Sequence, residues 1–185
     1  VKPLVLKKGC DILNSIGAKD GDAASRLVQY MLAASFDDAE QIKTIVTKSC
    51  ALLPVLSTNA PAETLTMVQT LLNAVGDDEI KNTIIRKSCE VLGSLSANNG
   101  PAAFSLTQTL LSSVDEKSEV RTLAVGKAAD IIPGLVSNDA QSAILLIQNL
   151  MATTGGDTAL TKTVVEKVRD TIPASGEKNP AAVVS

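Results

Sequence analysis

One six-residue segment recurs five times along this chain, and the recurrence limits the fold more than any other feature. Its copies begin at Lys8, Lys48, Lys87, Lys127 and Lys167, at intervals of 40, 39, 40 and 40 residues. A glutamine keeps the same interval, at Gln29, Gln69, Gln108 and Gln148. A fixed period of about forty residues is typical of stacked supersecondary units. The sequence therefore predicts an array of similar structural repeats.

The third copy indicates what one repeat contains. Residues 79–96 form a predicted helix with an apolar face, and Arg86 and Glu90 lie on its opposite side. The apolar face consists of Ile80, Ile84, Ser88, Val91, Leu92 and Leu95. A second predicted helix follows, with Phe104, Leu106, Leu110, Leu111 and Val114 on its apolar face. Since two amphipathic helices cannot bury these faces alone, we expect the copies to stack into an α-solenoid.

Residues at fixed places in the repeat predict how the first helix packs and ends. The middle of its apolar face holds a small residue, which allows close approach of a partner helix, at Gly9, Ser49, Ser88 and Ala128. Six residues after the lysine stand poor helix formers: Asn14, Pro54, Gly93, Pro133 and Pro173. Proline lacks the N–H donor and clashes with the preceding turn, so we expect the helix to kink or end there.

Polar connections are expected next, at residues 57–59, 96–99 and 137–139. The second helix is then expected to begin with Pro61 or Pro101 in its first turn, or with Asp22 or Asp139 as its N-cap. Acidic turns close the repeats at 36–40, 76–79, 115–117 and 155–157. They lack the spacing of a calcium-binding loop, so we expect them to cap helices and to hold no metal.

The chain resembles the HEAT and armadillo class of α-solenoid proteins over its whole length. The resemblance rests on the helix pairs and on the prolines late in the first helix, Pro54, Pro133 and Pro173. It implies an all-α fold in a single domain, residues 1–185, with about four and a half repeats. We place the repeats at approximately 1–36, 37–76, 77–114 and 115–154, with an incomplete one at 155–185. Residues 179–185 echo the segment that begins at Gly100, so we expect a piece of a longer array or ends that another subunit covers.

The three cysteines, Cys10, Cys50 and Cys89, occupy one repeat position. Neighbouring helices pack about 8–10 Å apart, whereas a disulfide needs Cα atoms within about 7 Å. We therefore expect reduced, mostly buried thiols; a row of redox or metal-binding thiols is the alternative, although no CxxC pair or histidine accompanies it. Reduced thiols fit a cytoplasmic protein. The first residue is Val1, so we expect a fragment or a processed form.

Composition argues against several classes of function. The chain has no histidine, the commonest general base, and no nucleophile-elbow, phosphate-loop or dinucleotide motif, so we expect no enzyme and no cofactor. The net charge of −3 and a single tyrosine argue against nucleic-acid binding. No apolar run approaches the roughly 18 residues that span a membrane.

The repeated glutamines are the candidate binding residues. Gln29, Gln69, Gln108 and Gln148 are expected at the edge of the packed face, each followed by Tyr30, Thr70, Thr109 or Asn149. A row of side-chain amides can bind the backbone of an extended peptide, and proteins of the armadillo type use asparagine rows in this way. The alternative is structural, because glutamine is a good helix former and a repeated sequence repeats its surface.

The repeated lysines suggest ion pairs. An acid follows three residues later in four copies, at Asp11, Glu90, Asp130 and Asp170. Such i,i+3 pairs stabilise a helix surface, and we favour that role over a site for an acidic ligand.

The sequence thus favours a non-catalytic scaffold that binds another protein or an extended peptide on a repeat surface. A structural subunit that stacks end to end into fibres or lattices is one rival hypothesis. A carrier of a lipid or other apolar ligand is the second, suggested by a mean hydropathy of +0.20.

Overall fold

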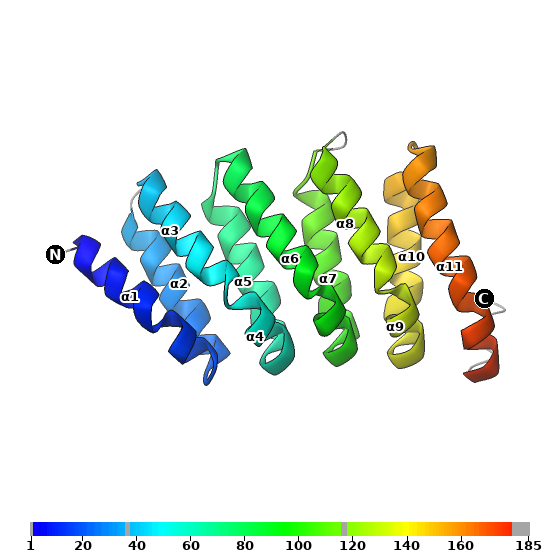
Figure 1. Ribbon diagram of the computed structural model, residues 1–185, viewed down its shortest axis with the longest axis horizontal. Coiled ribbons are helices and arrows are strands. Elements are labelled where there is room, and N and C mark those ends of the chain that lie inside the picture. The colour runs from blue at the N-terminus through cyan, green and yellow to red at the C-terminus, as the bar shows by residue number, and fades with distance from the viewer. Residues whose placement is uncertain (1, 36–37, 116–117, 179–185) are drawn as a thin grey trace. The chain divides into compact units, whose positions relative to one another are not determined.

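The protein is all-α in the computed structural model, which describes residues 2–35, 38–115 and 118–178 (Figure 1). The helices in these ranges are α1 (Lys2–Gly17), α2 (Gly21–Ser35), α3 (Ala39–Cys50), α4 (Leu53–Asn59), α5 (Pro61–Ala74), α6 (Asp78–Asn98), α7 (Gly100–Ser112), α8 (Glu119–Asp130), α9 (Ile132–Asn138), α10 (Ala140–Thr154) and α11 (Thr158–Lys178). The predicted all-α fold class is confirmed. The echo of Gly100 at 179–185 lies outside the described residues.

The chain divides into two compact units within α6, residues 1–91 and 92–185. In the first unit, α2 packs against α1, α3 and α5. Helix α1 also packs against α3, and the short α4 packs against α5. Contacts in this unit are thus mostly between helices that are near one another along the chain.

The second unit follows the same scheme. Helix α10 packs against α7 and α11, and α8 packs against α11. The short α9 lies against both α10 and α11. In both units, therefore, first helices contact first helices and second helices contact second helices.

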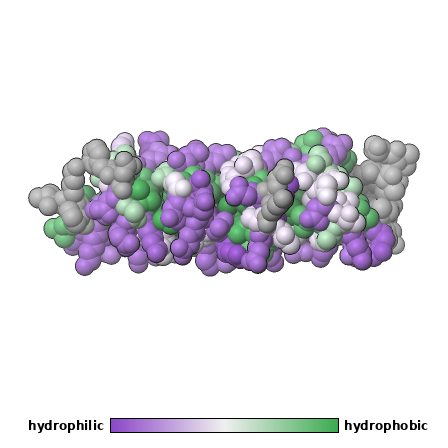
Figure 2. All heavy atoms as spheres, turned by 90° about the horizontal axis from the view of Figure 1, so that it is seen from above, coloured by the Kyte–Doolittle hydropathy of each residue, from purple (hydrophilic) through white to green (hydrophobic). Residues whose placement is uncertain are grey.

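Burial along α6 confirms the predicted apolar face. Ile84, Ser88 and Leu95 are wholly buried, and Arg86 and Glu90 are exposed. Ile80, in the first turn, is half-buried. Hydrophilic residues predominate on the face of the molecule shown in Figure 2, and hydrophobic residues reach the surface between them.

The small residues of the first helices are also buried, as predicted, at Gly9, Ser49, Ser88 and Ala128. Gly9 shows why size matters there. A Cβ atom on Gly9 would lie 2.6 Å from the sulfur of Met31, in α2. The glycine thus lets α1 and α2 approach closely.

The prediction that the first helix ends near its poor helix former holds only at two prolines. Helix α3 ends at Cys50 before Pro54, and α8 ends at Asp130 before Pro133. Each proline lies in the first turn of the short helix that follows, where its missing N–H would have no partner in any case. Helices α1, α6 and α11 continue past Asn14, Gly93 and Pro173, so they do not end at these residues, and a kink there stays a prediction. Asparagine and glycine keep the N–H donor that proline lacks.

Asn99 and Asp139 connect helices, as predicted, whereas the predicted polar connections are wrong at residues 57–59, 96–98 and 137–138, which complete helices α4, α6 and α9. Their side chains bond to carbonyls one turn back: the Ser57 hydroxyl donates to the Pro54 carbonyl at 3.0 Å, and Ser96 donates to Gly93 at 2.9 Å. Polar residues at a helix end satisfy backbone groups in this way without ending the helix. A single residue then links the two helices of each of these repeats: Ala60, Asn99 or Asp139.

That single residue is the N-cap of the second helix. Asp139 accepts from the Ser142 N–H at 3.1 Å, as predicted, and Asn99 accepts from Ala102 at 3.0 Å. The prediction for Asp22 is wrong. Asp20 caps α2 by accepting from the Ala23 N–H at 2.9 Å, and Asp22 lies in the first turn, paired with Arg26.

The acidic turns cap first helices, as expected. Asp38, Asp77 and Asp157 accept backbone N–H groups of α3, α6 and α11. The N-cap of α8 is a serine, Ser118, and not an acidic residue. Residues 36–37 and 116–117 of these turns lie outside the described residues.

Candidate functional site

The four repeated glutamines are all exposed on second helices: Gln29 on α2, Gln69 on α5, Gln108 on α7 and Gln148 on α10. Helices α2 and α5 pack together in the first unit, and α7 and α10 pack together in the second. The structure therefore brings the glutamines onto adjacent helices in two pairs. A single row of four remains a prediction.

The residues that follow the glutamines are less accessible. Thr70, Thr109 and Asn149 are half-buried, and Tyr30 is 74% exposed. The Thr109 hydroxyl donates to the Ser105 carbonyl of its own helix at 3.0 Å. The side-chain oxygen of Asn149 is buried and accepts no hydrogen bond among the described residues. These neighbours thus contribute less surface for a partner than the glutamines do.

Sequence reasoning missed how unevenly charge is divided between the helices. Helices α7 and α10 contain no Asp, Glu, Lys or Arg, and α5 contains only Glu63. By contrast, the first helix α6 carries six charged residues: Asp78, Glu79, Lys81, Arg86, Lys87 and Glu90. The signal was available, because counting charges helix by helix would have found it.

The exposed side of α10 also carries apolar residues. Leu145 is 37% exposed and Met151 is 38% exposed. They lie three residues before and after Gln148, so all three side chains share one side of the helix. The accessible groups here are amides and hydrocarbon, and no charge lies on the helix.

The repeated lysines form ion pairs, but not always within one helix. Lys87 pairs with Glu90 at 2.9 Å, and Lys127 pairs with Asp130 at 3.7 Å, as predicted. Lys167, predicted to pair with Asp170, instead contacts Asp130 at 2.8 Å. The expected pair of Lys8 with Asp11 is not among the ion pairs of the described residues. These exposed contacts favour the structural interpretation.

Cys10, Cys50 and Cys89 are buried and none of the three forms a disulfide, which confirms the prediction. Burial raises the pKa of the Cys10 thiol, and it raises the pKa of Cys50 to about 12. Both thiols are therefore protonated near neutral pH and behave as small apolar groups.

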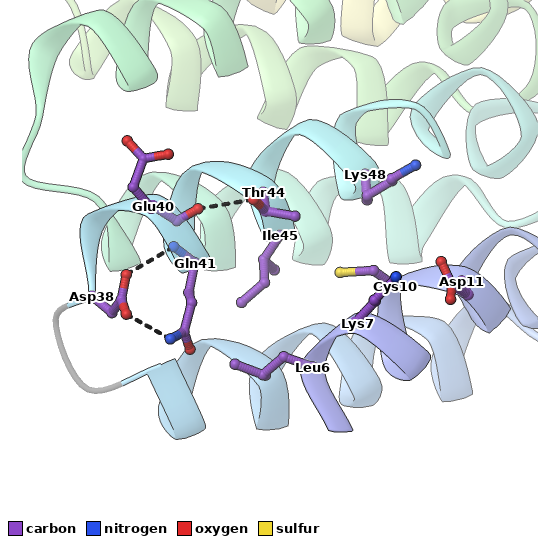
Figure 3. A pocket seen from close by; sticks show the side chains of 10 residues that line it. All are labelled: Leu6, Lys7, Cys10, Asp11, Asp38, Glu40, Gln41, Thr44, Ile45 and Lys48. Carbon is purple, nitrogen blue, oxygen red and sulfur yellow. Dashed lines mark hydrogen bonds between the residues drawn. The ribbon is translucent and has the colours of Figure 1, made fainter. Parts of the chain in front are cut away.

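A pocket of about 600 Å³ lies between α1 and α3, and sequence reasoning did not anticipate it (Figure 3). Helix α1 lines it with Leu6, Lys7, Cys10 and Asp11, and α3 with its N-cap lines it with Asp38, Glu40, Gln41, Thr44, Ile45 and Lys48. Leu6, Cys10 and Ile45 supply an apolar floor, and charged side chains surround it.

The described residues contain no cluster of three metal-ligating side chains, and none of their helices has the length and apolar character that crossing a membrane requires.

Comparison with known proteins gave no relatives. No family model matches the chain, and neither the curated proteins nor the solved structures contain a match.

Proposed function

We propose that this chain is a non-catalytic α-solenoid that binds another protein, or an extended peptide, on the exposed side of its second helices. The observation that carries the proposal is the repeated exposed glutamine on second helices, of which α7 and α10 carry no charged residue and α5 carries only one. Amide side chains offer a donor and an acceptor together, which matches the alternating N–H and C=O groups of an extended backbone. Exposed Leu145 and Met151 add apolar contact area beside Gln148.

The solenoid part of the proposal rests on the period of about forty residues and on the packing within each unit. In both units the second helices pack side by side, α2 with α5 and α7 with α10. Equivalent faces of successive repeats are thereby presented in the same direction within a unit. An extended ligand can use such a surface, because its own groups repeat at a regular interval.

The test is selection from a random peptide library with the immobilised protein. The variant carries Gln29→Glu, Gln69→Glu, Gln108→Glu and Gln148→Glu, which keep side-chain size but place charge on the surface. The matched control carries Thr83→Glu and Thr122→Glu, at exposed positions of the first helices α6 and α8. We expect the wild type and the control to enrich one common peptide motif that the glutamine variant fails to enrich. Enrichment of that motif by all three proteins would contradict the proposal.

The rival hypotheses have separate signatures. A subunit that assembles into fibres or lattices shows light scattering that grows with protein concentration. A carrier retains an apolar ligand that native mass spectrometry detects. A peptide-binding scaffold shows neither before a partner is added.

A further inference from the structure

The pocket between α1 and α3 includes a position at which the second repeat departs from the later ones. Seven residues before the repeated lysine, the second repeat has Gln41, whereas the later repeats have Ile80, Val120 and Leu160. Val120 and Leu160 are buried, and Ile80 is half-buried. The second repeat thus has a polar side chain where the later repeats have an apolar one.

The amide of Gln41 does not fill the pocket. Its Nε2 atom donates to one carboxylate oxygen of Asp38 at 2.5 Å, and its backbone N–H donates to the other at 3.1 Å. The side chain is therefore held at the start of α3, as Figure 3 shows. The volume of about 600 Å³ that remains is in the range of small-ligand sites.

Charge divides the pocket into two ends. Lys7, Lys48 and Asp11 gather beside Cys10 at one end, and Asp38 lies with Gln41 at the other (Figure 3). Glu40, next to the Asp38 end in sequence, also lines the pocket. One end therefore has a surplus of one positive charge and the other has two negative charges, with apolar Leu6 and Ile45 between them.

The separation of the ends sets the size of the ligand. Residues 38 and 48 are ten positions apart, which corresponds to about 15 Å along a helix. An extended peptide advances about 3.3–3.6 Å per residue, so three or four residues cover most of that distance. A single amino acid is too short to reach both ends.

We propose that the pocket binds a short apolar peptide with free termini, its carboxylate at Lys7 and Lys48 and its ammonium at Asp38 and Glu40. Apolar side chains of the peptide contact Leu6, Ile45 and the thiol of Cys10, which is neutral near pH 7 because burial raises its pKa. This site does not depend on the proposed function, because α1 and α3 do not carry the repeated glutamines.

Isothermal titration calorimetry of the whole chain with leucyl-alanyl-leucine tests the proposal. We expect binding, and a loss of about tenfold or more in affinity when the peptide is either N-acetylated or C-amidated, because each change removes a charge-assisted hydrogen bond. Apolar peptides of three or four residues are expected to bind more tightly than an apolar dipeptide, which is too short to reach both ends of the pocket. No binding of any of these peptides, or equal affinity of the free and the doubly capped forms, would overturn it.

Variants locate the binding. Gln41→Leu should weaken binding, because leucine cannot bond to Asp38 and its side chain is free to occupy part of the pocket, with the helical circular dichroism unchanged, since three other repeats hold an apolar residue there. Lys48→Gln should lower the affinity for the peptide with a free carboxylate but not the affinity for the C-amidated peptide. Lys43→Gln removes the same charge from an exposed position of α3 outside the pocket and should have no effect. Wild-type affinity in both Gln41→Leu and Lys48→Gln would place the peptide elsewhere and reject the site.

Discussion

The side-chain nitrogen of Lys167, in α11, lies 2.8 Å from a carboxylate oxygen of Asp130, in α8. The other oxygen of Asp130 lies 3.7 Å from Lys127, so one carboxylate serves lysines of two successive repeats. Asp170, the expected partner of Lys167, contacts its neighbour Arg169 at 3.0 Å. The hydrogen bond and the charge of Asp130 raise the pKa of Lys167.

Removing the Asp130 charge should therefore lower the pKa of Lys167. The variant is Asp130→Asn, and the measurement is an NMR titration of the lysine side chain. Asp170→Asn is the matched control, because Asp170 also raises this pKa but contributes less than Asp130. A larger decrease in the Asp170→Asn protein would mean that the pair forms within α11, as the sequence alone suggested.

A serine at position 60 should stabilise the protein. Ala60 is the N-cap of α5 and has no side-chain bond, with φ −147° and ψ 70°, close to the values of the capping residues Asn99 and Asp139. Ala60→Ser would cap the helix, and Glu63, three residues on, can complete a capping box. We expect the free energy of unfolding to rise by about 1 kcal/mol, measured by urea denaturation.

The control for this change is Ala62→Ser, which places the same side chain at an exposed position inside the first turn of α5. Serine there supplies no cap and is a poorer helix former than alanine. Equal stabilisation by the two variants would contradict the capping argument.

Overpacking at Ser88 should destabilise the protein. This residue is wholly buried, and its hydroxyl donates to the Ile84 carbonyl at 2.8 Å. Ser88→Leu adds volume where none is free, so we expect a loss of about 1–3 kcal/mol. Arg86→Leu, on the exposed side of the same helix, should change stability by less than about 0.5 kcal/mol. If the urea midpoints rank the two variants in the opposite order, then Ser88 does not lie on the buried face of α6.

Cys50 should make the fold weaker in alkali. Its pKa is about 12 in the folded protein because burial disfavours the thiolate, against about 8.5 when unfolded. Between these values the unfolded chain has lost the proton and the folded chain retains it. Stability present below about pH 8.5 is therefore lost as pH rises, by about 1.4 kcal/mol per pH unit.

The measurement is the urea midpoint of the wild type and of Cys50→Ala from pH 7 to pH 11. The variant has a constant offset from lost packing, so the comparison concerns slopes. We expect the wild type to fall more steeply above pH 9. Parallel curves would mean that Cys50 ionises normally.

Much of the fold could be predicted from the sequence, because the repeat period and the apolar face of each helix depend on the spacing of residues that are near one another in the chain. The predicted helix 79–96 corresponds to α6, Asp78–Asn98, and its face was assigned correctly. Helix ends were harder, because capping depends on backbone angles at single residues. Asp20 and Asp22 are equally suited by type, and only the geometry shows that Asp20 reaches the Ala23 N–H.

The candidate sites depended on packing between helices, which a repeat pattern does not reveal. Gln41 looks like an ordinary surface residue until its bond to Asp38 and the space beside it are seen. Lys167 likewise has an acid at the expected interval in sequence but a nearer one on α8. The exposed glutamines, by contrast, could be listed from their spacing alone.

The scarcity of charge on α5, α7 and α10 also bears on how a partner would bind. A surface made of amides, hydroxyls and hydrocarbon has little long-range attraction, so it does not steer a ligand during diffusion. Association should therefore proceed at an ordinary, unsteered rate. Few counterions would be displaced on binding and little charge would be screened by salt. Raising the ionic strength should therefore leave the affinity for the partner almost unchanged.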